Sequence, residues 1–507
     1  MLSCAHKARA VSLCNSDSKR NRSSSLLICL LYLLLPNLLF LIGWIRSWLA
    51  LPLATVLLIS VIYAWLRSNC NSSHTSAYTA KDYAALALTL MLGLLLVESL
   101  GLNGHMAQMG DFNVRTPIYY TLINQPWPIF SESGDYFIYY HIFWLPPALI
   151  AKYTSSWISA DTILFAWIYF GIVLFILLLF RRHRSKILVL FILICLLGSI
   201  VDLLYAPSSY AETSGLQSDW VDFLKGISVG RKNYRFVTFY GNIFTFNAWV
   251  PSILALGIFW ERSLRLSDFA YVITLILGSA FFQCFPLGVL FLAFLLHRKS
   301  FISKTLKNPL SWIGVILCFL YIIYFAGQMG KGSASAIHFI ASEAFPLPLK
   351  TKIYRYIIIL ITALLPAFLI LPKSYQRNAY FSSMLFIGVF TPLFWIGRAN
   401  NEFCFKSGQI FYMIFSYLLF LHWNRAKRKR KVLITIFVLL SSIHFFGDLY
   451  RRDICHYGWN DATRQKHIIP CNMEHINKPE GYYYYNFYGV VKFPLIQYNH
   501  PGESYIK

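Results

Sequence analysis

Apolar runs of about twenty residues recur along the whole chain, separated by polar segments. A helix needs such a run to cross the hydrocarbon core of a bilayer, which is about 30 Å thick. The runs predict spanning helices at 26–45, 48–66, 82–101, 162–180, 187–205, 243–260, 311–328, 353–371, 380–397, 409–423 and 431–448. The pattern therefore predicts an all-α polytopic membrane protein.

Basic residues gather at alternate ends of these runs, which predicts the orientation of the chain. The strongest clusters lie in residues 1–25, at 181–186 and at 425–431. Cytoplasmic loops are enriched in Lys and Arg, so these clusters place the N-terminus in the cytoplasm. In a soluble protein, the net charge of +24 would suggest a nucleic-acid partner. Here the basic residues lie between apolar runs, which favours a membrane protein with no nucleic-acid partner.

Two apolar runs fit the alternation only if they are not simple spans. The run 136–152 must stay at the outer face for the 181–186 cluster to lie inside, and the pair Pro146–Pro147 would break a crossing helix. We expect its tyrosines, His141 and Trp144 at the headgroup level. An ordinary short span is the alternative, which one further crossing elsewhere would accommodate.

The run 269–296 is long enough for one span, but a single crossing would place His297, Arg298 and Lys299 outside. A break at Gln283–Pro286 would instead make a hairpin of two short segments and keep those charges inside. With the hairpin, the sequence predicts about thirteen crossings, a cytoplasmic N-terminus and an outer C-terminus, in a plasma (inner) membrane protein.

Composition and motifs narrow the function classes. The chain is 57% hydrophobic and 13% charged over 507 residues, far more apolar than a soluble domain. The ten cysteines form no CxxC pair, although Cys455 and Cys471 could pair in an oxidising compartment. The basic start followed by apolar runs is interpreted as an uncleaved span. GxGxxG, Walker, GxSxG and HExxH patterns are absent, so nucleotide-driven transport and common hydrolase sites lack support.

The first long outer loop holds the strongest candidate for chemistry. Asp111 follows a span by about ten residues, close to the lipid surface. Such a carboxylate can act as a general base or hold a divalent cation, and a divalent cation is the one cofactor that the sequence suggests. The alternative is that Asp111 only caps the helix that follows it. Glu132 and Asp135 could be further substrate-binding carboxylates, or part of a solvated turn.

Outer-face cations could bind a lipid-linked phosphate. Contact with anionic headgroups is the alternative for each of them. His338 is an isolated histidine in another outer loop, and no histidine has the spacing of a zinc site. The candidate substrate-binding residues are Arg115, Arg231, Lys232, Arg235, Glu132, Asp135, His338 and Arg398.

This layout resembles the GT-C superfamily of integral-membrane glycosyltransferases. The resemblance rests on an acidic residue soon after a span, Asp111 in GDFN, on two juxtamembrane helices at about 115–124 and 136–152, and on the proline–aromatic segment that leads from Phe143 into the next span. It implies an enzyme that transfers a sugar from a polyprenyl-phosphate carrier to an envelope glycan or lipid, with Asp111 as the base and Arg231, Lys232 or Arg235 on the phosphate. The chain departs from the family in lacking an acidic pair at Asp111, a Leu-Tyr-Tyr after the prolines and a large soluble C-terminal domain.

Two alternatives stay open beside the glycosyltransferase. An O-antigen polymerase or ligase would depend on Arg231, Arg235 and His338 rather than Asp111, and a lipid-linked saccharide transporter or flippase would need charged groups near mid-membrane. The expected regions are an N-terminus with two added spans (1–81), a GT-C-like core (82–310) with outer loops at 102–161 and 206–242, C-terminal spans (311–449) and an outer tail (450–507).

Overall fold

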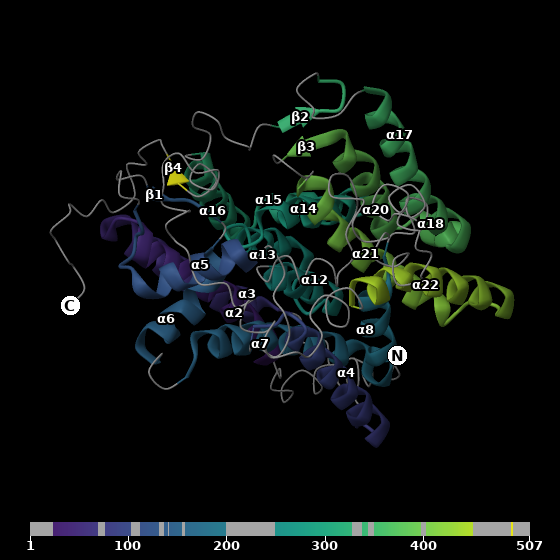
Figure 1. The fold of residues 1–507 in the computed structure, drawn as a ribbon, viewed down its shortest axis with the longest axis horizontal. Coiled ribbons are helices and arrows are strands. Elements are labelled where there is room, and N and C mark those ends of the chain that lie inside the picture. The colour runs from purple at the N-terminus through teal and green to yellow at the C-terminus, as the bar shows by residue number, and fades with distance from the viewer. Residues whose placement is uncertain are drawn as a thin grey trace, which may run out of the picture.

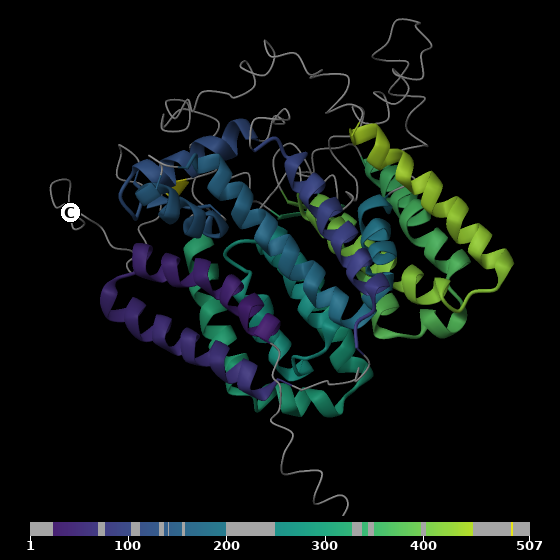
Figure 2. The same cartoon turned by 90° about the horizontal axis from the view of Figure 1, so that it is seen from below.

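A computed structural model describes residues 24–68, 77–102, 112–130, 136–139, 141–154, 158–198, 249–326, 337–342, 349–396, 402–449 and 488–489. This part of the chain is helical apart from four strands of two or three residues (Figure 1). The N-terminal helices and the C-terminal helices lie at opposite ends of the longest axis, and helices from the middle of the sequence lie between them (Figure 1, Figure 2).

The helices follow one another along the chain in the order of the predicted apolar runs. In the first half they are α2 (Ser24–Trp44), α3 (Ser47–Arg67), α4 (Ala80–Glu98), α5 (Phe112–Asn124), β1 (Tyr136–Phe137), η1 (Ile142–Trp144), α6 (Leu145–Thr154), α7 (Ala160–His183), η2 (Arg184–Lys186) and α8 (Ile187–Leu196). In the second half they are α12 (Val250–Glu261), η4 (Leu266–Asp268), α13 (Phe269–Leu275), α14 (Phe281–His297), α15 (Ser300–Leu306), α16 (Pro309–Ala326), β2 (Ile337–Phe339), α17 (Leu349–Ile359), η5 (Leu360–Leu364), α18 (Leu365–Ile370), α19 (Lys373–Gln376), α20 (Ala379–Phe390), η6 (Thr391–Leu393), β3 (Phe394–Ile396), α21 (Glu402–Trp423), α22 (Arg428–Leu449) and β4 (Tyr488–Gly489).

Six helical stretches of the described chain are long and apolar enough to cross a membrane, as expected of a polytopic membrane protein. They are Ser24–Trp44, Ser47–Arg67, Ala80–Glu98, Ala160–Leu196, Pro309–Ala326 and Phe403–Trp423. Of the other predicted spans, 431–448 lies in the continuous 22-residue helix α22, and 243–260, 353–371 and 380–397 are shorter or broken. The run 353–371, for example, passes through a π-helical turn before Pro366, where a proline cannot donate the helical hydrogen bond. The count of thirteen crossings therefore stays a prediction.

Contacts between helix ends sort the connections into two groups. In one group, the Ser185 amide donates to Asp82 Oδ1 (2.9 Å) and Arg67 Nη1 donates to Asn308 Oδ1 (3.1 Å). The salt bridge between Arg181 and Glu261 (3.2 Å) joins further helix ends to this group. We call this end of the molecule the basic face; it comprises residues 67, 79–82, 181–186, 261–268, 298–308, 374–378 and 424–425.

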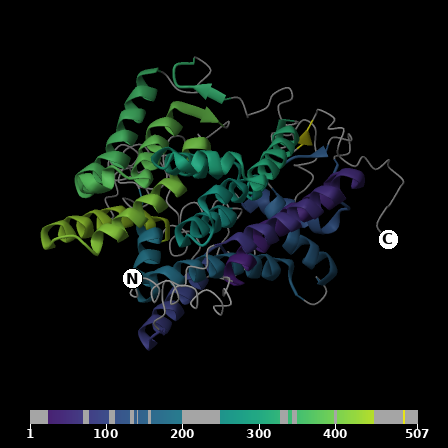
Figure 3. The ribbon, with the colours of Figure 1, turned by 180° about the vertical axis from the view of Figure 1, so that it is seen from behind.

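The other group of connections forms the loop face, which comprises α5, β1, α6, β2, β3 and β4. Its short strands pair as β1 with β4 and β2 with β3, both antiparallel. The Tyr324 hydroxyl, near the end of α16, donates to the Phe137 carbonyl of β1 (2.8 Å), and Figure 3 shows that end of α16 beside β1 and β4. For each of these bonded pairs of connecting segments, the sequence predicts that both members lie on the same side of the membrane.

The hairpin predicted for 269–296 is confirmed, but the predicted position of its break is wrong. Arg298 returns to the basic face, where it lines the same cavity as Arg265. The chain turns at 276–280, between α13 and α14, whereas Gln283–Pro286 lies within α14. The turn needs Gly278, because a Cβ there would lie 2.5 Å from Ile142 Cδ1 and 2.7 Å from Tyr321 Cε1.

The run 136–152 is not one helix, which agrees with the prediction that it does not cross. It is divided into β1, η1 and α6, and α6 has only ten residues, about 15 Å of helix. One expectation for this segment is wrong. Tyr136, Tyr139, His141 and Trp144 are at most 8% exposed, so they pack inside the protein instead of facing lipid headgroups.

Candidate functional site

Helices α5 and α6 form a small platform on the loop face. They pack against each other and α6 also packs against α7. The Tyr119 hydroxyl of α5 donates to the Ala160 carbonyl at the start of α7 (2.9 Å). Lys152 of α6 donates to the Gln125 carbonyl (2.8 Å) and lies over the Trp127 ring. These bonds fix the segment that follows Asp111 in sequence against the first turn of a spanning helix.

A polar network below the platform holds it to the helices at the centre of the protein. Asn37 of α2 donates from Nδ2 to the Leu33 and Leu275 carbonyls (2.7 and 2.8 Å). Its Oδ1 accepts from the Tyr321 hydroxyl of α16 (2.6 Å). Tyr324, one turn further along α16, is bonded to β1. The amide therefore joins α2, the hairpin of α13 and α14, and the helix that supports β1.

His141 is the histidine closest to this platform in sequence, and it is fully buried. Its ring lies 4.9 Å from that of Trp44 and 5.0 Å from that of Phe137. Neither ring nitrogen has a hydrogen-bond partner among the described residues. Burial lowers the pKa of His141 to about 3, so the ring is neutral near pH 7 and is a poor general base. It serves as an aromatic packing element.

Two of the candidate site residues lie in the described part of the chain. Arg115, on α5, is only 5% exposed, so its guanidinium lies within the protein and not on the membrane surface as a free outer cation. His338 is half-buried in β2, opposite Trp395 of β3. Figure 1 shows β2 and β3 well apart from α5 and α6, so these two residues belong to different parts of the loop face.

The remaining candidates lie outside the described residues, as do Cys455 and Cys471. They are Asp111, Glu132, Asp135, Arg231, Lys232, Arg235 and Arg398. Asp111 directly precedes the first residue of α5. Within the ranges that the structure describes, no group of three His, Cys, Asp or Glu side chains could hold a metal ion.

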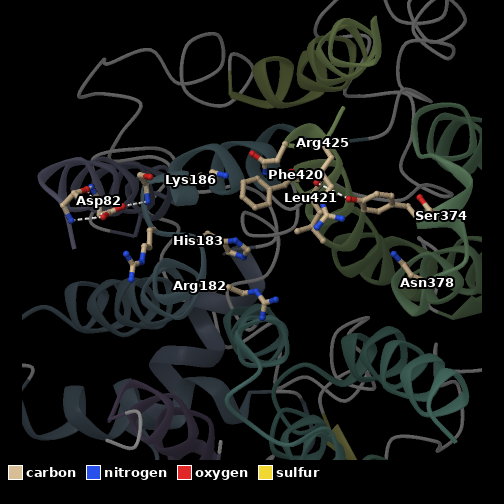
Figure 4. Close-up of a pocket in the computed structure, with 14 residues that line it drawn as sticks. Asp82, Arg182, His183, Lys186, Ser374, Asn378, Phe420, Leu421 and Arg425 are labelled. Atoms are coloured by element: carbon tan, nitrogen blue, oxygen red, sulfur yellow. Dashed lines mark hydrogen bonds between the residues drawn. The ribbon is translucent and has the colours of Figure 1, made fainter. Parts of the chain in front are cut away.

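A cavity of about 790 Å³ opens on the basic face (Figure 4). It is lined by the start of α4, the end of α7 and η2, the 374–378 segment and the end of α21. Asp82, its carboxylate, accepts from the Thr79 amide and hydroxyl (both 2.8 Å) and from the Ser185 amide. This carboxylate is fully used in capping α4 and joining it to η2, so it is structural.

Two of the four Lys and Arg side chains that line this first cavity are engaged by the protein as well. Arg182 donates to the Trp260 carbonyl (2.8 Å), and Arg184 lies over the Tyr78 ring (5.1 Å). Ser374, Asn378 and Asn424 supply neutral polar groups. The arrangement can hold a small polar molecule, and its described lining contains no paired nucleophile and base.

A second cavity, of about 810 Å³, lies elsewhere on the basic face and is lined by α3, α12, α14, α15 and the segments between them. Neither cavity was predicted from the sequence, in which the basic clusters at 181–186, 262–265, 298–299 and 425–431 were interpreted only as signs of topology. These clusters occur at helix ends that are predicted to lie on the same side of the membrane, and this shared side could have indicated the cavities.

Comparisons with known proteins supply no family for this chain. No family model, no curated protein and no solved structure matches it.

Proposed function

We propose that this protein is a membrane glycosyltransferase that moves a sugar from a polyprenyl-phosphate carrier to a glycan or lipid acceptor at the loop face. One observation carries the proposal. Between α4 and α7, both long and apolar enough to span, the chain forms two short packed helices, α5 and α6, and the single acidic residue of GDFN directly precedes α5. This is the order of elements that the GT-C resemblance requires.

In the proposed reaction, the Asp111 carboxylate takes the proton of an acceptor hydroxyl. The acceptor oxygen forms a bond to the anomeric carbon of the sugar, and the bond from that carbon to the phosphate oxygen breaks. The phosphate keeps the electron pair of the broken bond, and Arg231, Lys232 or Arg235 stabilises its added charge. Charge-assisted hydrogen bonds of this kind are the strongest that side chains offer to a phosphate.

The test is Asp111→Asn, assayed for sugar transfer from polyprenyl-phosphate-linked donors in membranes that contain equal amounts of inserted protein. Asn caps helices as well as Asp does, so the variant removes the base and keeps any capping role. We expect at least a hundredfold loss, which is typical for a general base. The matched control is Asp161→Asn on the same face, where an amide oxygen can still accept from the Tyr120 hydroxyl (3.2 Å).

Retained turnover in Asp111→Asn would refute the proposal. If His338→Ala abolishes activity while Asp111→Asn is active, the polymerase or ligase function is favoured instead. The position of His338 in the β2–β3 ribbon, apart from α5, makes these two outcomes separable.

A further inference from the structure

The second cavity on the basic face, which we call the basic cavity, collects cations from four separate segments. Tyr63 and Arg67 come from the end of α3, and the segment after α12 adds Arg262 and Arg265. The end of α14 and the short helix α15 complete it. Its six cationic side chains are Arg67, Arg262, Arg265, Arg298, Lys304 and Lys307, and no Asp or Glu is among its lining residues.

The carboxylates nearest in sequence compensate part of this charge, because Asp268 interacts electrostatically with Arg67 and Arg265. Glu261 is paired with Arg181 at 3.2 Å and also accepts from the Ser263 hydroxyl. Asp268 is buried behind the cavity wall, where its Oδ1 accepts from Asn308 Nδ2 (2.7 Å) and the Ser267 hydroxyl (3.1 Å). One buried acid beside six lining cations leaves a strongly positive cavity, and such a cavity attracts anions.

Arg262 occupies a backbone conformation that favours glycine. It follows the last residue of α12 with φ of 66° and ψ of 15°, in the left-handed region. A side chain at this position is strained, and strain of this kind tends to occur where a side chain has a functional role. The arginine lines the cavity, and its charge acts on the nearby Tyr380 hydroxyl.

Most of the remaining lining is apolar, apart from Tyr63, Ser267 and Asn308, and it adjoins surface that is suited to lipid. Phe259, Phe269, Phe294 and Phe301 contribute rings to the cavity. The α3 and α16 helices beside it pack together and carry exposed apolar side chains along their outer sides, namely Leu58, Ile59, Ile62, Val315, Ile316 and Phe319. A cavity with a cationic interior and an apolar border matches a molecule with an anionic head and an apolar chain.

Trp312 marks the depth of the cavity in the bilayer. It lies in the first turn of α16, is 59% exposed, and donates from Nε1 to the Leu306 carbonyl (2.9 Å). Exposed tryptophans of membrane proteins concentrate at the headgroup level. Asn308, which lines the cavity, is four residues before Trp312, so the cavity lies where lipid phosphates are.

We propose that the basic cavity binds the phosphate group of an anionic phospholipid from the surrounding bilayer leaflet. The phosphate lies among Arg67, Arg265 and Arg298, and the acyl chains run along the exposed side of α3 and α16. The site is on the face opposite α5 and α6, and the proposal does not depend on the proposed sugar transfer.

The experiment measures lipid binding to the full-length protein in detergent by native mass spectrometry. Phosphatidylglycerol is titrated into the wild type, with phosphatidylcholine as the zwitterionic reference and inorganic pyrophosphate as a soluble competitor. The test variant is the double substitution Arg265→Gln with Arg298→Gln. The matched control, Lys427→Gln with Arg428→Gln, removes the same charge from exposed positions at the start of α22, outside the lining of either cavity.

We expect the wild type to bind one phosphatidylglycerol more tightly than phosphatidylcholine. The test variant should bind it about 25-fold more weakly, from roughly fivefold for each cation lost at a membrane surface. The control should bind it as the wild type does. Arg265→Lys with Arg298→Lys should restore most of the affinity, which separates loss of charge from misfolding.

Equal weakening in the test and control variants would overturn the proposal, because the effect would then be diffuse surface charge. Absence of a preference for phosphatidylglycerol over phosphatidylcholine would also overturn it. Displacement of bound phosphatidylglycerol by pyrophosphate at micromolar concentration would support an anion site but assign it to a soluble phosphate, which overturns the lipid as its occupant.

Discussion

Asn37 is the side chain whose replacement tests the tertiary structure most directly. It is fully buried near the middle of α2 and makes three hydrogen bonds, to the Leu33 and Leu275 carbonyls and from the Tyr321 hydroxyl. Leu275 is the last residue of α13, where a helix leaves carbonyls without helical partners. We expect Asn37→Leu to fold with the same topology and lower stability, since leucine fits the apolar surroundings but cannot donate or accept.

The expected magnitude follows from the groups left behind. The Leu33 carbonyl is in the middle of α2 and keeps its helical partner, so two groups, the Leu275 carbonyl and the Tyr321 hydroxyl, lose this partner. Each buried group left unsatisfied costs about 1–3 kcal/mol in water-soluble proteins, and about 0.6 kcal/mol per interhelical bond is the average found within membranes. The free energy of unfolding should therefore fall by about 1–6 kcal/mol, with the membrane average at the lower end and the water-soluble maximum at the upper end.

The assay is reversible unfolding in mixed micelles, monitored for Asn37→Leu, for Tyr321→Phe and for the double variant. Because the two side chains share a bond of 2.6 Å, the double variant should lose less stability than the sum of the single variants. Thr89→Val is the control, since the Thr89 hydroxyl donates only to the Ala85 carbonyl of its own helix (2.6 Å). Additive losses, or a loss no larger than that of the control, would refute the proposed link among α2, α13 and α16.

Two further predictions concern the loop face and the crossing of α7. Burial lowers the pKa of His141 from 6.5 to about 3. Its neutral form therefore contributes stability that is complete above pH 6.5. This stability is lost as pH falls toward 3, by up to about 1.4 kcal/mol per pH unit. His141→Phe should flatten the pH dependence of the melting temperature below pH 6.5, and an unchanged slope would contradict the buried environment. Cysteines placed at Thr154 and Ser185 should react with a membrane-impermeant maleimide from opposite sides, because the 24-residue α7 separates them; labelling of both from one side would show that α7 does not cross.

Helix positions were predictable because the length of an apolar run reflects the thickness of the bilayer. The runs at 26–45, 48–66 and 311–328 correspond to α2, α3 and α16 within about two residues. The breaks were less predictable. A proline was expected to break 269–296, yet Pro286 is accommodated in α14 and the turn forms at Gly278. Gly278 is needed there because Ile142 and Tyr321, both distant in sequence, approach its backbone.

The candidate site was predictable in its location along the chain and less so in its surroundings. The order α5, then α6, then α7 follows the predicted layout, since two prolines and a polar loop prevent a continuous crossing helix. The burial of Tyr136 and His141 was not predictable. An aromatic residue looks the same in a sequence whether its side chain packs on lipid or on protein. Only the positions of Trp44, Phe137 and Tyr324 decide between the two.

The sequence alone determined that this is a helical membrane protein, which runs are long enough to cross, and which connections share a face, because hydrophobic length and charge act locally along the chain. Only the tertiary structure decided which cavities and which links between helices those connections form. Six cations from four segments become one cavity only when α3, α12, α14, α15 and the start of α16 are packed together. Asn37 likewise becomes a link between helices only when Leu275 and Tyr321 are brought to it. Hydrogen bonds and electrostatic fields depend on distances of a few ångströms, and the packing of distant segments sets those distances.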